Sequence, residues 1–215
     1  MKGMDKHLKT AWLLACILAL SGCAVGNTHA YRDADIKIAA GGDKKVGLAT
    51  HDERDFVVSG SKSESFVGLT RGGFGNPFDV TTSSGKALAD DFTTAISSGL
   101  KKRGFTPIPA SITSHDSLSA VQKQLVATKA DRLLLVRMIE WKSDTWTNTT
   151  LGYNLIATVQ DSQGKVLAEK QIQGKDNLGG SAINPPGHAK TAVPAAFTQK
   201  LETLLNSPEI QNAFN

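Results

Sequence analysis

The sequence has little cysteine and no long apolar run. Only two of its 215 residues are cysteines, Cys16 and Cys23. Its longest apolar stretch, residues 11–20, is about half the length that a helix needs to cross the hydrocarbon core of a bilayer. The sequence therefore predicts no transmembrane helix.

The short apolar stretch is instead typical of a signal peptide. Three lysines precede it and small residues follow it, as in a secretory leader. It ends in Leu20-Ser21-Gly22-Cys23, which resembles a bacterial lipobox. The resemblance implies cleavage between Gly22 and Cys23 and lipidation of the Cys23 thiol. A diacylglycerol and an amine-linked acyl chain would supply the two or more lipid chains that stable anchoring requires. The alternative is a buried N-terminal helix.

Cleavage would change what the remaining composition allows. It removes three lysines and one aspartate, so the formal net charge falls from +4 to +2, with 21 basic and 19 acidic residues left. The remaining basic residues are scattered, whereas nucleic-acid binding needs a clustered basic face; no nucleic-acid partner is predicted. Cys16 would leave with the leader and Cys23 would carry lipid, so no thiol is left for a disulfide, a catalytic nucleophile or zinc.

The chain divides into three parts. We expect a signal peptide over residues 1–22, a lipidated tether over residues 23–34, and one periplasmic domain over residues 35–215. The tether is predicted because residues 24–34 are small and polar and have no hydrophobic period. The residue after the lipidated cysteine is Ala24 rather than aspartate, and the lipobox resemblance then implies anchoring in the bilayer of the outer membrane.

Alternating and continuous apolar runs predict the strands. The run at residues 131–140 is apolar almost throughout, as in a strand covered on both faces, and is the best candidate for the middle of a sheet. Two later runs flank Asp161-Ser-Gln-Gly164 and predict an antiparallel hairpin. The predicted strands are residues 35–40, 45–50, 56–58, 65–69, 105–108, 131–140, 151–160 and 165–173.

Residues at helical spacing predict three helices. Leu88, Phe92, Ile96 and Leu100 lie four apart, so they share one face. A second helix follows Asp116, its expected N-cap. A third covers residues 191–206 and is expected to begin near residue 192, because Pro194 is tolerated only in a first turn. A short helical turn follows Ser207-Pro208.

These elements predict a single-domain α/β sandwich. A mixed sheet carries two or three packed helices, and a C-terminal hairpin precedes the terminal helix. With the lipobox, the segment Val67–Asn76 and the helix end Lys102-Arg103-Gly104-Phe105, this layout resembles the YajG-like bacterial lipoproteins. The resemblance implies a periplasmic domain similar to envelope-assembly accessories. It transfers no catalytic residue and implies no cofactor.

Catalytic and metal motifs are sparse. Residues His51–Asp55 follow a strand and are interpreted as a solvated loop with weak surface ion pairs; a functional site is the alternative. The histidines downstream of Cys23 lie far apart without metal-ligand spacing, so no metal site is predicted. Ser-x-x-Lys occurs three times, but the partner motifs of penicillin-interacting serine enzymes are absent.

Two pairs of residues are candidate partner contacts. Trp141 and Trp146 bracket the end of the central strand, and their odd separation places them on opposite faces, so one of them is expected in the core. Pro185 and Pro186 lie in a loop that can offer a rigid contact surface.

The expected function is non-enzymatic binding or assembly of an envelope protein. The alternative is a module that binds or hydrolyses cell-wall glycan. An open sheet edge or apolar patch near Trp141, Trp146 or Pro185 would favour binding. A concave site holding a carboxylate of raised pKa would favour an enzyme.

Overall fold

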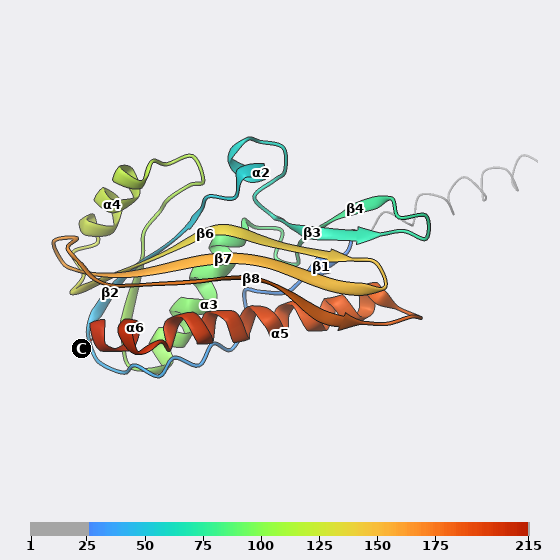
Figure 1. The fold of residues 1–215 in the computed structure, drawn as a ribbon. Helices are drawn as coiled ribbons and strands as arrows, with labels where there is room; N and C mark the ends of the chain where they lie inside the picture. Colours follow the sequence, from blue (N-terminus) through green and yellow to red (C-terminus); the bar gives the residue numbers. More distant parts are fainter. Residues whose placement is uncertain (1–25, 215) are drawn as a thin grey trace, which may run out of the picture.

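The computed structural model describes residues 26–214. Over this range eight strands form one mixed sheet, and helices pack on both of its faces (Figure 1). This arrangement confirms the predicted α/β fold class. Gly22 and Cys23, the two residues of the expected cleavage and lipidation site, lie outside the described residues.

The sheet is forked around its longest central strand. The strands are β1 (Thr28–His29), β2 (Lys45–Asp52), β3 (Phe66–Arg71), β4 (Pro77–Thr82), β5 (Thr106–Pro109), β6 (Arg132–Thr145), β7 (Asn148–Asp161) and β8 (Val166–Gly180). On one side β6 pairs with β7, which pairs with β8. On its other side β6 pairs first with β2 and then with β3. One arm of the fork is β2–β5, and the other is β3–β4–β1.

The helices are α2 (Asp55–Val58), α3 (Leu88–Lys102), α4 (Leu118–Ala127), α5 (Pro185–Leu205) and α6 (Pro208–Ala213). Within residues 26–214 none of them has the length and apolarity to cross a membrane. The predicted stripe of α3, Leu88 to Leu100, is fully buried. Gly104 follows the helix with φ of 93°, a left-handed conformation that suits glycine at a helix end.

Both faces of β6 are buried, as its sequence predicts. Leu134 and Val136 join the large cluster under α3, α5 and α6, while Leu133 and Leu135 join the smaller cluster under α4. This division follows from the period of two along a strand, which sends successive side chains to opposite faces. The seven-residue register with β2 and the thirteen paired positions with β7 fix β6 as the centre of the sheet.

The prediction that the folded body starts at residue 35 is too late. Residues 28–29 pair with β4 as strand β1, and the ring of Tyr31 is fully buried among Trp141 and Phe197. This segment folds onto the core although its other residues are mostly polar, because burying the ring of Tyr31 removes a large apolar surface from water. Of the expected tether, residues 26–34 therefore belong to the folded body.

The predicted strand at residues 35–40 is extended but unpaired with any strand. Its alternation is real, since Ile36 and Ile38 are buried. Its backbone instead bonds to side chains at the end of α5: Lys37 N donates to Glu202 Oε1 at 2.9 Å and Ala39 N to Asn206 Oδ1 at 2.8 Å. Alternation predicted which side chains are buried but not the hydrogen-bond partners.

Three further sequence predictions are wrong in detail. Residues 56–58 form the helix α2 rather than a strand, since one buried residue, Val57, suffices to anchor this single turn. The N-cap of α4 is Ser117 rather than Asp116, whose carboxylate accepts from Thr113 N. Helix α5 begins at Pro185, and Pro194 lies inside it.

Helix α5 tolerates Pro194 because its flanks are strongly held. Val193 and Phe197 are completely buried on either side of the proline, and the Asn184 side chain caps the helix by accepting from Gly187 N at 2.9 Å. These contributions offset the cost of an interior proline, about 3 kcal/mol.

A buried arginine closes the gap at the fork of the sheet. Arg54 follows β2 and has no exposed surface. Its Nε and Nη2 donate to the two carboxylate oxygens of Asp52 at 2.8 and 2.7 Å. Its guanidinium also donates to the backbone carbonyls of Phe66, Trp141 and Glu64. Arg54 thereby joins β2 to β3 and β6 where the two arms diverge. The interpretation of residues 51–55 as a solvated loop is wrong for His51, Asp52 and Arg54, which are buried.

Replacing Arg54 tests this role. Arg54→Met should lower the free energy of unfolding by about 3–5 kcal/mol, because it leaves the Asp52 charge buried without its partner. The double variant Asp52→Asn/Arg54→Met removes both charges but still removes the arginine donors of Phe66 O and Trp141 O, whereas Glu64 O keeps its hydrogen bond from Leu88 N. It should therefore remain at least about 2 kcal/mol below the parent. Urea denaturation followed by the fluorescence of buried Trp141 measures the free energy of unfolding of both variants. Full recovery in the double variant would show that Arg54 serves only to neutralise Asp52.

Candidate functional site

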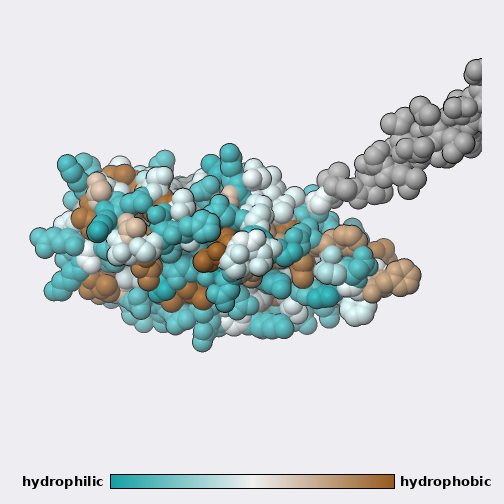
Figure 2. All heavy atoms as spheres, turned by 90° about the horizontal axis from the view of Figure 1, so that it is seen from above, coloured by the Kyte–Doolittle hydropathy of each residue, from teal (hydrophilic) through white to brown (hydrophobic). Residues whose placement is uncertain are grey.

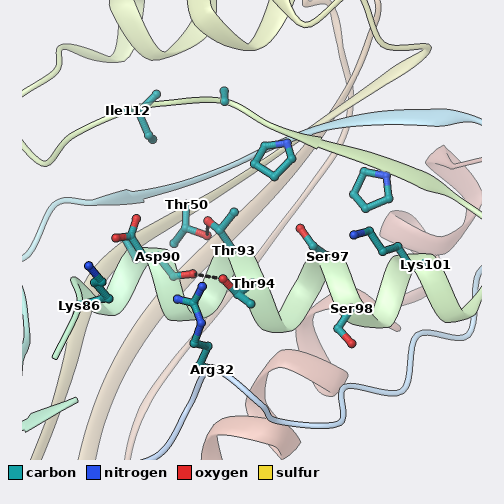
Figure 3. Close-up of a pocket in the computed structure, with 14 residues that line it drawn as sticks. Arg32, Thr50, Lys86, Asp90, Thr93, Thr94, Ser97, Ser98, Lys101 and Ile112 are labelled. Carbon is teal, nitrogen blue, oxygen red and sulfur yellow. Dashed lines mark hydrogen bonds between the residues drawn. The ribbon is translucent and has the colours of Figure 1, made fainter. Parts of the chain in front are cut away.

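A wide depression lies between α3 and the segment that follows β5. Its volume is about 610 Å³. A smaller one of about 200 Å³ adjoins it and shares Thr50, Ala89, Asp90 and Ile112. We call the two together the α3 cleft. Figure 3 shows Thr93 and Ser97 on the side of α3 that faces Ile112, with Lys86 and Lys101 towards the two ends.

Hydroxyl groups and cations dominate the lining of the cleft. Thr93 Oγ1 donates to Thr50 Oγ1 at 2.9 Å. Ser97 Oγ is buried and has no hydrogen-bond partner among the described residues. Arg32, Lys86 and Lys101 add positive charge. Such a lining can hydrogen-bond a polyhydroxylated or anionic ligand, because each group can donate to an oxygen.

A repeat on α3 could have predicted this cleft. Ala89, Thr93, Ser97 and Lys101 lie four residues apart and all line it, next to the apolar stripe that packs on the sheet. Residues at this spacing share a face of a helix. Sequence reasoning followed only the apolar stripe and missed the polar one beside it.

Asp52 and Glu64, two of the carboxylates near the cleft, are held in an ion pair or a hydrogen bond, whereas Asp90 is exposed and lines both depressions. Asp52 lines the smaller depression, but both of its oxygens accept from Arg54. Glu64 accepts from Ser114 Oγ at 2.7 Å. Burial raises the pKa of Asp91 against the opposing effects of Ser84 and Arg32, but Asp91 lies outside the lining of both depressions.

Glu53 forms a second charged cluster beyond β2. Its carboxylate accepts from Arg137 Nε and Nη2, both at 2.7 Å, and contacts His51 Nδ1 at 2.9 Å. Burial acts to raise the pKa of Glu53, but the hydrogen bonds from Arg137 and His51 outweigh it and hold the pKa below its usual range. This cluster ties the end of β2 to β6. Within residues 26–214 no three His, Asp or Glu side chains converge as metal ligands.

The two tryptophans occupy opposite environments. Trp141 is fully buried, packs edge-on against Phe92 and Phe197, and donates from Nε1 to Tyr31 Oη at 3.3 Å. Its prediction as a partner contact is therefore wrong, because the core encloses the ring. Trp146 is 57% exposed at the turn between β6 and β7.

The two prolines begin a helix rather than a free loop. Pro185 and Pro186 occupy the first turn of α5 and are half-buried. Proline suits this position because it has no N–H to leave unpaired there. Pro185 and Pro186 remain near the surface, five residues beyond the end of β8.

The fold and the cleft define a single-domain α/β protein with a forked mixed sheet and an open, polar groove. Its sequence gives no match to a protein-family model and none to a curated protein. The fold resembles that of a Xanthomonas campestris protein assigned to the family DUF330, with a TM-score of 0.55, 12% identity, and coverage of 86% of this chain and 96% of that one. At this identity the likeness shows the fold alone.

Two other solved structures are more distant. Lipoprotein GNA1162 from Neisseria meningitidis has a TM-score of 0.40 and 14% identity, covering 72% of this chain and 98% of that one. PelC from Paraburkholderia phytofirmans, a dodecamer, has a TM-score of 0.41 and 14% identity, covering 79% and 93%. Similarities this low support no argument about function.

The Glu53 cluster predicts a pH-dependent contribution to stability. Since the pKa of Glu53 is lowered in the folded state, its contribution is complete above the ordinary value of 4.5 and is lost as pH falls through the lower folded value. Glu53→Gln should cost about 1–2 kcal/mol near pH 7 and much less near pH 3. Urea denaturation at both pH values measures the difference. An equal cost at both would mean that the carboxylate charge contributes nothing.

Proposed function

We propose that this chain is a YajG-like lipoprotein that is anchored through Cys23 in the outer membrane and binds another envelope protein without catalysing a reaction. The lipobox residues Leu20–Cys23 support the anchor, and Ala24 supports the outer membrane. The folded body starts by residue 28, so it would lie close to the bilayer on the periplasmic side.

The outer edge of β8 is the observation that carries the binding function. This strand has 15 residues, and its only strand partner among the described residues is β7. The edge ends near two of the predicted contacts, since Gly180 pairs with Asn148 beside Trp146 and lies five residues before Pro185. A free edge presents unpaired N–H and C=O groups that another strand can join.

The other two edges of the sheet are poor templates by comparison. Strand β5 has four residues, and two of them are Pro107 and Pro109. Strand β1 has two residues. The long strand β8 contains no proline, and two of its four charged side chains are paired with helices, Lys170 with Glu209 and Asp176 with Lys200.

Site-specific photocrosslinking tests the edge. A photoreactive side chain at Gln171 or Gln173, both exposed on β8, should give a discrete adduct with one envelope protein. The same side chain at Lys123, exposed on α4, which packs over β2 and β6 rather than on β8, should give none. Mass spectrometry of the adducts identifies the partner. Adducts of the chain with itself alone, or equal labelling from Lys123, would contradict binding of a different protein at β8.

The α3 cleft favours one second function, a module that binds cell-wall glycan. Its hydroxyl groups and three cations suit a hydroxyl-rich, partly anionic polymer.

Retention on purified peptidoglycan tests this second function. Lys101→Glu reverses a charge at the cleft and should lower retention about tenfold, since a charge-assisted hydrogen bond contributes about 1.5–3 kcal/mol. Lys123→Glu makes the same charge change outside the cleft and should leave retention unchanged. Equal loss in both variants would point to non-specific electrostatic adsorption.

A further inference from the structure

Four large apolar side chains project from one end of the molecule. Phe74 is 102% exposed and Ile183 is 97% exposed, relative to free side chains, while Phe78 and Trp146 are 55% and 57% exposed. Phe74 and Phe78 belong to the β3–β4 hairpin, Trp146 to the β6–β7 turn, and Ile183 to the β8–α5 loop. We call these four residues the loop end.

Hydrogen bonds and strand register hold the three loops side by side. Thr70 of β3 pairs with Thr145 of β6, next to Trp146. Ser181 N donates to Thr147 O at 3.2 Å and ties the β8–α5 loop to the β6–β7 turn. Figure 1 shows the three connections at the same end of the elongated sheet, and Figure 2 shows apolar residues gathered there.

The local charges at this end are largely neutralised. Arg71 donates from Nε and Nη2 to both oxygens of Asp144, at 2.8 and 2.6 Å, and Lys62 pairs with Asp79. The bidentate Arg71–Asp144 pair also ties the β3–β4 hairpin to β6. The charged groups beside Phe74 and Trp146 are thus paired, which lowers the cost of bringing this end of the molecule out of water.

The chain enters the folded body at this end. Strand β1 runs parallel to β4, with Thr28 opposite Thr81, and β4 starts at Pro77 beside the hairpin tip. The chain before Thr28 therefore runs back towards the tip, and Gly26 lies near the carbonyl of Asp79. Only three peptide steps separate Gly26 from Cys23, and they can span at most about 10 Å.

We propose that the loop end inserts into the interfacial layer of the bilayer that carries the lipid on Cys23. This inference rests on the proposed lipidation, because the short connection then keeps the loop end close to the membrane. Tryptophan favours the interfacial layer, and burying phenylalanine and isoleucine side chains there contributes roughly 25 cal/mol per Å² of apolar surface. The domain is then held at four side chains as well as at its lipid, and its orientation is fixed.

Fluorescence in brominated lipid tests the insertion. The full-length protein is expressed with its leader, purified in lipidated form, and reconstituted in phosphatidylethanolamine–phosphatidylglycerol vesicles with or without bromine on the acyl chains. Bromine at interfacial depth should quench about half of the total emission, the share of Trp146, since Trp141 is buried in the core and remains bright. Trp146→Phe should remove the quenched component and identify its source.

Two matched double variants locate the contact. Phe74→Ser/Ile183→Ser removes the two most exposed apolar residues, neither of which contributes to the core, and should reduce the quenching of Trp146 at least about twofold. Val166→Ser/Leu167→Ser removes two exposed apolar residues at the opposite end of β8 and should leave the quenching unchanged.

The outcomes separate this inference from the proposed anchor. Mass spectrometry of the N-terminal peptide reports whether Cys23 carries lipid. A lipidated protein whose Trp146 is not quenched would overturn the insertion and leave the anchor intact. If an envelope protein then shields this unquenched Trp146 from solvent, the loop end would be assigned to that protein instead. Equal effects of the two double variants on the quenching of Trp146 would also overturn the insertion. An unlipidated Cys23 would overturn the anchored function and the insertion with it.

Discussion

The fold depends on how one strand, β6, changes neighbours along its length. Between its pairing with β2 and its pairing with β3, the ladder leaves carbonyl groups without a strand partner. Arg54 donates to the carbonyl of Trp141 in this gap and to those of Phe66 and Glu64 at the start of the β3 arm, while Asp52 neutralises its charge. An arginine suits this position because its planar guanidinium carries five N–H donors in a fixed arrangement. Without such a group the two arms of the sheet would meet around unpaired buried polar atoms, which cost about 1–3 kcal/mol each.

The fork also separates the surfaces to which we assign different roles. The β2–β5 arm and α3 form the polar cleft, whereas the β3–β4–β1 arm carries the hairpin of the loop end and receives the N-terminal chain. The edge of β8 lies on the far side of β7 from both arms. Glycan contact would thus use a surface separate from the other two, while the membrane contact would adjoin the β8 edge only at its Gly180 end, beside Trp146.

Patterns with strong local causes were predictable from the sequence. The two-sided burial of β6, the β7–β8 hairpin and the apolar stripe of α3 follow from periodicity alone, and the structure confirms them. Features set by distant contacts were not predictable. Tyr31 lies in a polar segment whose burial depends on Trp141 and Phe197, more than 100 residues away in the chain. The sequence at residues 51–55 resembles a surface loop, because the groups that enclose Arg54, among them Phe66 and Trp141, come later in the chain. Lipidation of Cys23 stays a prediction.

The unequal edges of the sheet limit how copies of this chain could assemble. Molecules that pair sheet to sheet form a filament only if each has two open edges, because each molecule must pair with one neighbour at either edge. Within residues 26–214 only β8 is long and free of proline at an edge, while Pro107 and Pro109 interrupt β5 and β1 is two residues long. Two copies that joined through β8 would use up both templates and form a closed twofold pair. The prolines of β5 thus keep copies of this protein from polymerising through their sheets.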